Sequence, residues 1–177
     1  MLTSYAPLAA TLDREADWFT RTLEDRLRRY ADGRGPGAGP DLPSPPEPGD
    51  PCAYGAAVSH HQLGVHERLV LILALLPWIR PQALDPLLLR NASIDRPFTE
   101  FGGVASPARA FAPTRQTALF LIAGDDLVVR TRSIAMFAVE GALVRNRLLA
   151  QQADDYAPWM PLDPHPQLIE RLFRAPM

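Results

Sequence analysis

The side chains that could do chemistry in this chain are four histidines, one cysteine and a group of carboxylates. A helical metal site uses two histidines four residues apart, whereas His61 and His66 are five apart and His60 points about 100° away from His61. Cys52 follows a proline and has no evident activating base. We therefore expect no metal centre and no cysteine nucleophile, and the single cysteine excludes an intramolecular disulfide.

Carboxylates gather between Asp95 and Asp126, with Glu100 and Asp125 among them. Acid–base catalysis needs two carboxylates that face one cleft with separated pKa values. No spacing in this segment forces that arrangement. We predict instead that Asp125 caps a helix and that Asp95 and Arg96 form a surface or loop-locking pair.

A nucleotide site would need a phosphate loop of the form GxxxxGK[ST], in which backbone N–H groups and a lysine hold the phosphates. The stretch GRGPGAGP (residues 33–40) is rich in glycine, but its prolines remove donors, and all 18 basic residues of the chain are arginine. We expect no ATP site, no cofactor and no catalytic activity in this chain by itself.

Composition places the chain among globular proteins. At 177 residues with a net charge of -2, it can bury a normal core and has no overall attraction for nucleic acid or acidic lipid. The longest apolar stretch, Leu69 to Ile79, is about half the ~20 residues of a membrane span. Asp13, Glu15 and Asp17 near the start do not suit a signal peptide. We expect a cytoplasmic protein with no membrane contact.

Three segments follow one another along the chain. Residues 1–32 form an expected amphipathic helical arm, because apolar residues recur at helical spacing from Leu8 to Ala31. Residues 33–51 hold seven prolines and five glycines, which predicts a flexible linker. Its Pro-x-x-Pro spacing fits a spacer better than a peptide ligand. The arm would then be tethered to the domain of residues 52–177, and its apolar stripe would lie on that domain or on a partner helix.

Residues 52–177 predict a mainly α (α+β) domain of winged-helix type with a C-terminal β-hairpin. The expected helices span residues 52–63, 65–76, 82–89, 115–123, 125–137 and 164–173, the last capped by Asp163. The expected strands span residues 143–151 and 159–162, with a turn-rich loop between them.

The segment Ser93–Asp126 begins with a polar stretch that contains glycines, and it continues into an apolar helix. Phe98 and Phe101 can bury, while Gly102 and Gly103 allow a tight reversal. Either Thr114 or Thr117 can cap the helix. Two interpretations follow: the segment braces the helix, or it contacts a partner.

This segment also resembles a known family. DRPFTEFGG (residues 95–103), followed by PT..TALFLIAGDD (residues 113–126), is similar to the N-terminal domain of the AAA+ ATPase associated with phage-tail-like contractile injection systems. HERLVLILALLPWIRPQALD (residues 66–85) resembles a helix and turn of the same family. The likeness covers roughly residues 52–175. In that family the domain is similar to a winged helix and precedes the module that carries the Walker motifs.

The resemblance implies a non-catalytic interaction domain that contacts a tail component or its own ATPase ring, with oligomers formed through the parent ATPase. The candidate interaction residues are those of the signature, namely Asp95, Arg96, Phe98, Glu100, Phe101, Gly102, Gly103, Thr114, Thr117, Asp125 and Asp126. The chain departs from the family at Arg115 and Gln116, where the family tends to carry Gly-Glu. A role of that carboxylate is therefore not carried over.

A winged helix that binds DNA by itself is the competing interpretation. Its recognition helix would lie in the segment PQALDPLLLR (residues 81–90), which is mostly leucine and suits protein packing better than base readout. Arg145 and Arg147 would give the expected wing only a small basic surface for contacting DNA phosphates. We therefore expect a protein partner rather than nucleic acid, and a small enzyme ranks last.

Overall fold

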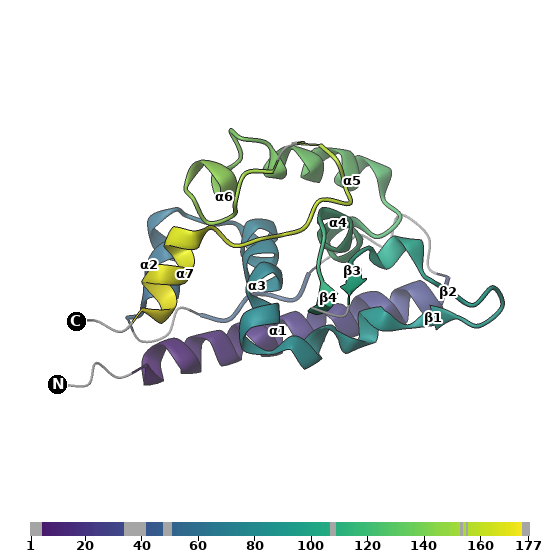
Figure 1. The fold of residues 1–177 in the computed structure, drawn as a ribbon, viewed down its shortest axis with the longest axis horizontal. Helices are drawn as coiled ribbons and strands as arrows, with labels where there is room; N and C mark the ends of the chain where they lie inside the picture. Colours follow the sequence, from purple (N-terminus) through teal and green to yellow (C-terminus); the bar gives the residue numbers. More distant parts are fainter. Residues whose placement is uncertain are drawn as a thin grey trace.

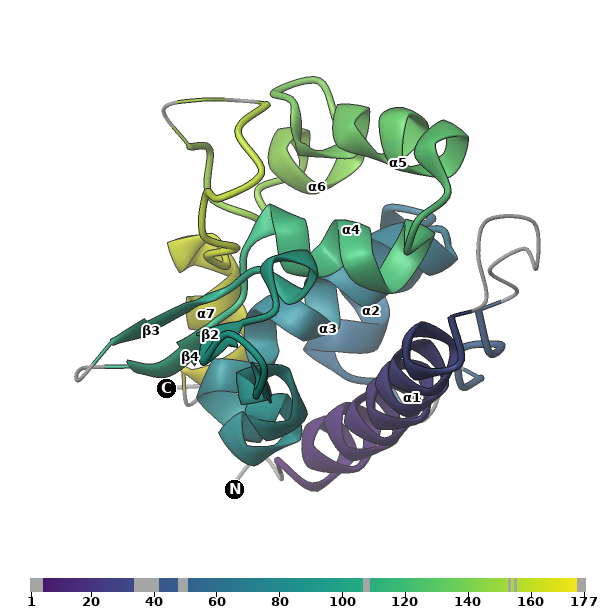
Figure 2. The ribbon, with the colours of Figure 1, turned by 90° about the vertical axis from the view of Figure 1, so that its right-hand side faces the viewer.

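The computed structural model describes residues 5–33, 42–47, 51–106, 109–152, 154 and 156–174, and over these residues the protein is mainly helical with small antiparallel hairpins. The helix α3 (Val65–Ile79) lies at the centre, and its residues from Leu69 to Leu76 are all buried. Helix α1 lies along one side of α3, and α4 followed by α5 lies on the other (Figures 1 and 2).

The long N-terminal helix α1 (Ala6–Ala31) confirms the predicted helix and its apolar stripe. Leu12, Trp18, Phe19 and Leu23 are buried in the same hydrophobic core as α3 and α4. The apolar stripe of α1 thus lies on the helices α3 and α4, one of the two surfaces that the sequence allowed for it. The physical reason is that the apolar face of an amphipathic helix must be buried against another surface, and the nearest such surface is formed by the neighbouring helices of the domain.

Part of the predicted flexible linker also lies against the helices. In residues 42–47, Leu42 packs on the core, and the Pro43 carbonyl accepts a hydrogen bond of 2.7 Å from the Trp18 indole. This stretch has neither helix nor strand but is held in place by α1. Residues 34–41 and 48–50 of the predicted linker lie outside the described residues.

The helices α2 (Ala53–His60) and α3 match two predicted helices, although α3 continues through Pro77 to Ile79. The predicted third helix is instead a 3-10 helix, η1 (Pro81–Leu88), which contains Pro86. Because proline lacks the N–H that an α-helix needs, two prolines in eight residues favour the shorter 3-10 turns. A helix and a 3-10 helix around a tight turn therefore replace the expected helix-turn-helix.

The strands lie elsewhere than predicted. Two short antiparallel hairpins occupy residues 90–112. They are formed by β1 (Arg90–Asn91) with β2 (Arg96–Pro97), and by β3 (Val104–Ser106) with β4 (Arg109–Ala112), separated by the 3-10 turn η2 (Thr99–Phe101). The β3–β4 hairpin extends to one side of the molecule (Figure 2).

The predicted C-terminal hairpin is wrong. Residues Ala142–Arg145 form a short helix, α6, and the N–H groups of Leu148 and Leu149 both donate to the Leu143 carbonyl at 2.9 and 3.0 Å. Single bridges join Thr114 to Pro161 and Leu149 to Pro164. Residues 143–149, LVRNRLL, have apolar residues at both ends and polar ones between them, and so short a pattern fits a helix or a strand equally well.

The remaining helices are α4 (Arg115–Ala123), α5 (Leu127–Ile134) with the 3-10 turn η3 (Ala135–Phe137), and α7 (Pro166–Phe173). The side chain of His165, not that of Asp163, caps α7 by accepting a hydrogen bond from the Gln167 N–H at 3.1 Å. Pro166 then takes the first helical position, so the predicted pattern is shifted by two residues.

No single helix in the described ranges is long and apolar enough to cross a membrane. The helices α3 and η1 pass that test only as a pair, and the chain bends by 105° between them.

Candidate functional site

The first part of the signature supplies the turn and the second strand of the β1–β2 hairpin. Asp95 lies at its turn with a φ of 48° and accepts a 3.0 Å hydrogen bond from Arg90 Nε on its carboxylate. Arg90 also donates to the Asp95 backbone carbonyl. The predicted pairing of Asp95 with Arg96 is therefore wrong, because the antiparallel register brings Arg90, five residues earlier, next to the turn, while Arg96 lies exposed opposite Asn91.

Phe98 and Phe101 fold back against α1. Their rings surround Tyr30, with centroid distances of 5.7 Å and 5.4 Å, and Phe101 also contacts Phe120 of α4 at 4.8 Å. Edge-on aromatic pairs of this kind add about 0.5–1.5 kcal/mol each beyond the burial of area. Burial raises the pKa of the Tyr30 hydroxyl, and the carboxylate of Glu100 beside it raises that pKa further. The signature loop is thus attached to α1, a contact that the sequence did not predict.

Gly102 and Gly103 make the tight reversal as predicted, with φ values of 64° and 80°. A Cβ on Gly103 would lie 2.1 Å from the Phe111 ring, so only glycine fits. The Gly103 N–H donates to Thr114 Oγ1 at 3.1 Å, and the Thr114 N–H donates to Thr117 Oγ1 at the same distance. Both threonines therefore take part at the start of α4, which joins the loop to the helix.

Arg115 and Gln116, at the start of α4, also hold this junction together. Arg115 is buried, donates to the Asp154 carbonyl at 2.6 Å and lies over the Phe137 ring. Gln116 Nε2 donates to the Glu100 carbonyl at 2.8 Å, and Gln116 Oε1 accepts from Arg130 of α5. Arg115 and Gln116 thus connect the start of α4 to the loop, to α5 and to the residues near Asp154.

The two aspartates that end the signature have different roles. Asp126, not Asp125, caps α5: one of its carboxylate oxygens accepts from the N–H groups of Val128 and Val129 at 2.9 and 3.0 Å. Gly124 ends α4 with a φ of 52° and shifts the start of α5 by one residue from the predicted position. Asp125 is left on the surface.

Replacing Asp126 with alanine is expected to lower the free energy of unfolding by about 1 kcal/mol, because two N–H groups at the start of α5 lose their acceptor. Asp125→Ala serves as the neighbouring control and is expected to change stability by less than about 0.5 kcal/mol. Urea denaturation followed by circular dichroism measures both. Equal losses for the two variants would contradict the assignment of the cap.

A shallow pocket opens where the loop, α4 and the start of α5 meet, with a volume of about 520 Å³. Its lining includes two signature carboxylates, Glu100 and Asp125, together with Phe120, Leu127 and Arg130. Leu127 is 73% exposed and the adjacent Val128 is 61% exposed, so two neighbouring aliphatic side chains face solvent in the first turn of α5. Leu127 and Val128 thus form an exposed apolar rim directly after the signature and beside the pocket.

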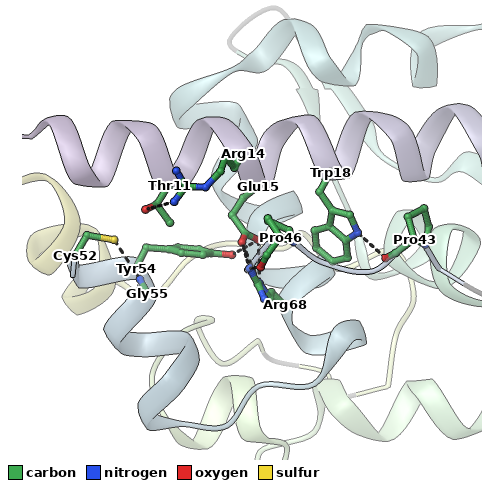
Figure 3. Close-up of polar contacts among 10 residues, drawn as sticks. All are labelled: Thr11, Arg14, Glu15, Trp18, Pro43, Pro46, Cys52, Tyr54, Gly55 and Arg68. Carbon is green, nitrogen blue, oxygen red and sulfur yellow. Dashed lines mark hydrogen bonds and ion pairs between the residues drawn. The ribbon is translucent and has the colours of Figure 1, made fainter. Parts of the chain in front are cut away.

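A second polar site, which the sequence did not predict, lies under residues 42–47 (Figure 3). Arg68 Nε donates to Glu15 Oε1 at 3.0 Å, Tyr54 Oη donates to Glu15 Oε2 at 3.0 Å, and Arg68 Nη2 donates to the Pro46 carbonyl at 2.6 Å. Glu15 is only 1% exposed. Its position in the apolar spacing Leu8, Leu12, Glu15, Phe19 was the signal that could have revealed a buried pair.

The pKa directions agree with a tightly held ion pair. Burial raises the pKa of the Tyr54 hydroxyl well above its ordinary value, and the negative charge of Glu15 adds to that shift. Burial by itself would lower the pKa of Arg68, but the hydrogen bonds and the charge of Glu15 outweigh it and raise the pKa. Both groups therefore keep their protons through the physiological range, with Arg68 charged and Tyr54 neutral.

No family model, curated protein or solved structure matches this chain. Within the described ranges, no three side chains of His, Cys, Asp or Glu converge as metal ligands. The rings of His60 and His61 instead contact each other edge to face at 4.8 Å.

Proposed function

We propose that this chain is a non-catalytic protein-interaction domain, of the kind that precedes the AAA+ module in ATPases of phage-tail-like contractile injection systems. The resemblance of residues 52–175 to that family suggests the setting. The observation that carries the interaction role is the exposed rim of Leu127 and Val128 beside the Glu100–Asp125 pocket. Such a domain would act in the cytoplasm, on a tail component or on its own ATPase ring.

The internal contacts of the signature support an interaction role over catalysis. Phe98, Phe101, Gly103 and Thr114 are used to brace the loop on α1 and α4. Glu100 uses its backbone carbonyl for Gln116, which leaves its carboxylate beside Tyr30 at the pocket. A braced loop with an exposed apolar and acidic rim is pre-organised for docking, since little ordering is needed on binding.

A winged-helix relationship is part of this proposal. In it, α3 and η1 would correspond to the helical turn and the β3–β4 hairpin to the wing, in place of residues 143–162. The residues of η1 that face solvent, such as Gln82, Asp85 and Leu88, do not form a basic surface, so the proposal favours a protein partner over DNA.

A photo-crosslinking amino acid at position 127, in cells that express the contractile tail genes, is expected to capture a tail component or the ATPase ring. Position 159 is the matched control, because Trp159 is 68% exposed and does not line the pocket. Leu127→Asp is expected to weaken the captured interaction at least tenfold, as for the loss of a central interface residue. Thermal unfolding should be unchanged, because Leu127 is exposed.

Two results would contradict the proposed function. One is an equal crosslinking yield at positions 127 and 159, and the other is a salt-sensitive shift of duplex DNA in a gel. Sequencing the native gene beyond codon 177 gives an independent test, because the proposal expects a GxxxxGK[ST] motif within the next hundred or so codons.

A further inference from the structure

The corner between α4 and α5, residues 124–126, leads directly into the rim of Leu127 and Val128. The last four carbonyls of an α-helix have no partner further along the same helix. In α4 the first and the last of these four accept from N–H groups of the corner itself. The two bonds run from Gly124 N–H to the Phe120 carbonyl at 2.9 Å and from Asp126 N–H to the Ala123 carbonyl at 3.0 Å. Because Leu121 and Ile122 are buried, the two carbonyls between them need donors from elsewhere in the chain.

Arg26 of α1 supplies those donors, although it lies 95 residues before Leu121 in the sequence. Arg26 Nε and Nη2 both donate to the Leu121 carbonyl, at 3.1 and 2.8 Å, and Nη2 also donates to the Ile122 carbonyl at 3.1 Å. Hydrogen bonds from a charged donor are stronger than those between neutral groups. One side chain of α1 therefore completes the end of α4.

The guanidinium of Arg26 also packs on the corner. A Cβ on Gly124 would lie 2.7 Å from Arg26 Nη1, so a larger residue there would push the guanidinium away from the helix end. Burial lowers the pKa of Arg26, and the charge of Arg29 adds to that shift. The carboxylates of Asp25 and Asp125 act in the opposite direction. Arginine keeps its proton in proteins even so, and the positive charge of Arg26 suits the negative end of the α4 dipole.

Tyr30 connects the same helix to the other side of the pocket. It lies four residues after Arg26, so both side chains are on one face of α1. The Tyr30 ring contacts Phe98 and Phe101 of the signature loop at 5.7 and 5.4 Å. The pocket lies between this loop and the corner. Two adjacent turns of α1 therefore hold both sides of the pocket, through an aromatic cluster on one side and a guanidinium on the other.

We propose that Arg26 is a positioning residue of the interaction surface, which holds the corner and the Leu127–Val128 rim in the orientation that the partner docks on. The helix α1 is then a part of the interaction site, although the residues that line the pocket come from the loop, α4 and α5. The role assigned to Arg26 rests on the proposed function, since it concerns the same surface.

Amide hydrogen exchange of the full chain, measured by NMR, tests whether Arg26 holds the corner. In Arg26→Met two carbonyls at the end of α4 lose a charged donor, so the amides of Gly124 and Asp126 are expected to exchange about tenfold faster. Val58→Ala is the stability control, because Val58 is buried on α2, which packs on α1 and α7. It should speed exchange at the central amides of α3 and leave the corner amides at their original rates.

Capture through the crosslinking amino acid at position 127 tests the docking role. Arg26→Met is expected to lower the capture about fivefold, which corresponds to the docking orientation in about one molecule in five. Arg26→Lys should recover part of the capture, because an ammonium group can still donate to one carbonyl but lacks the planar fork of arginine. Arg21→Met, the same substitution at an exposed position of α1, should leave the capture unchanged.

The role of Arg26 is overturned if Arg26→Met leaves exchange at the corner unchanged, or if capture at position 127 stays at the level of Arg21→Met. It is also overturned if Val58→Ala lowers the capture as much as Arg26→Met, because stability would then account for the effect. A lack of capture by the unaltered chain has a different meaning. It removes the proposed function, and the docking role with it, whereas the exchange rates still decide whether Arg26 holds the corner.

Discussion

Arg68→Met is expected to lower the free energy of unfolding by about 3–5 kcal/mol, because it leaves the buried carboxylate of Glu15 without its charged partner. The Pro46 carbonyl loses its donor in the same step. A loss of this size is a large part of the roughly 5–15 kcal/mol that holds a typical domain together. Urea denaturation, followed by fluorescence and by circular dichroism, measures it.

The control for this variant is Arg174→Met, which makes the same substitution in an exposed pair with Glu170. It is expected to cost less than about 0.5 kcal/mol, because solvent screens an exposed ion pair. Adding Glu15→Gln to Arg68→Met should recover much of the loss, since a neutral amide can still accept from Tyr54. A small loss for Arg68→Met, similar to that of Arg174→Met, would show that the Glu15 carboxylate is not effectively desolvated.

Gly103→Ala is expected to cost about 2–5 kcal/mol. Roughly 1–2 kcal/mol comes from placing a side chain at a φ of 80°, where L-residues are strained. A further cost of about 1–3 kcal/mol comes from overpacking, because the new methyl group would lie 2.1 Å from the ring of Phe111. Thermal and urea denaturation report the loss, and crosslinking at position 127 shows whether the pocket survives.

Gly33→Ala separates these two contributions. Gly33 has a φ of 61°, but among the described residues nothing lies within 4 Å of the position that a Cβ would take, so only the backbone cost of about 1–2 kcal/mol should remain. If Gly103→Ala lowered the free energy of unfolding by no more than Gly33→Ala, the Phe111 ring would have to move away at no energetic cost. The close contact between the loop and β4 would then not constrain the signature.

Local signals in the sequence located most of the helices. The apolar spacing from Leu8 onward predicted α1, the run from Leu69 to Leu76 predicted α3, and Thr114 with Thr117 marked the start of α4. These signals succeed because helix periodicity and caps depend on residues within one or two turns. The same signals failed by one position at Asp126, whose neighbour Asp125 is chemically equivalent, and by two positions at His165, which caps α7 although Asp163 is the more usual type of capping residue.

Long-range contacts account for the features that were missed. The hairpin at residues 104–112 and the short helix at residues 142–145 were both missed, because the periodicity of so short a stretch does not separate a helix from a strand. The candidate functional site was likewise predicted in part from local signals and decided in part by long-range contacts. The sequence identified Phe98, Phe101, Gly102 and Gly103 as a tight, partly buried loop, but the packing of that loop on Tyr30 depends on where α1 lies.

The sequence by itself determined a mainly helical chain with a glycine-rich signature segment, the lack of a phosphate-loop motif in its 177 residues, and a proline-rich stretch that can form neither a helix nor a central strand. Only the tertiary structure decided that α1 belongs to the core, that Arg68 meets Glu15 across 53 residues, and that Pro43 and Pro46 meet buried donors. The physical reason is that φ restrictions and helical periodicity depend on neighbouring residues. In contrast, an apolar helix face or a charged side chain is buried only where a surface distant in the sequence can pack against it or pair with it.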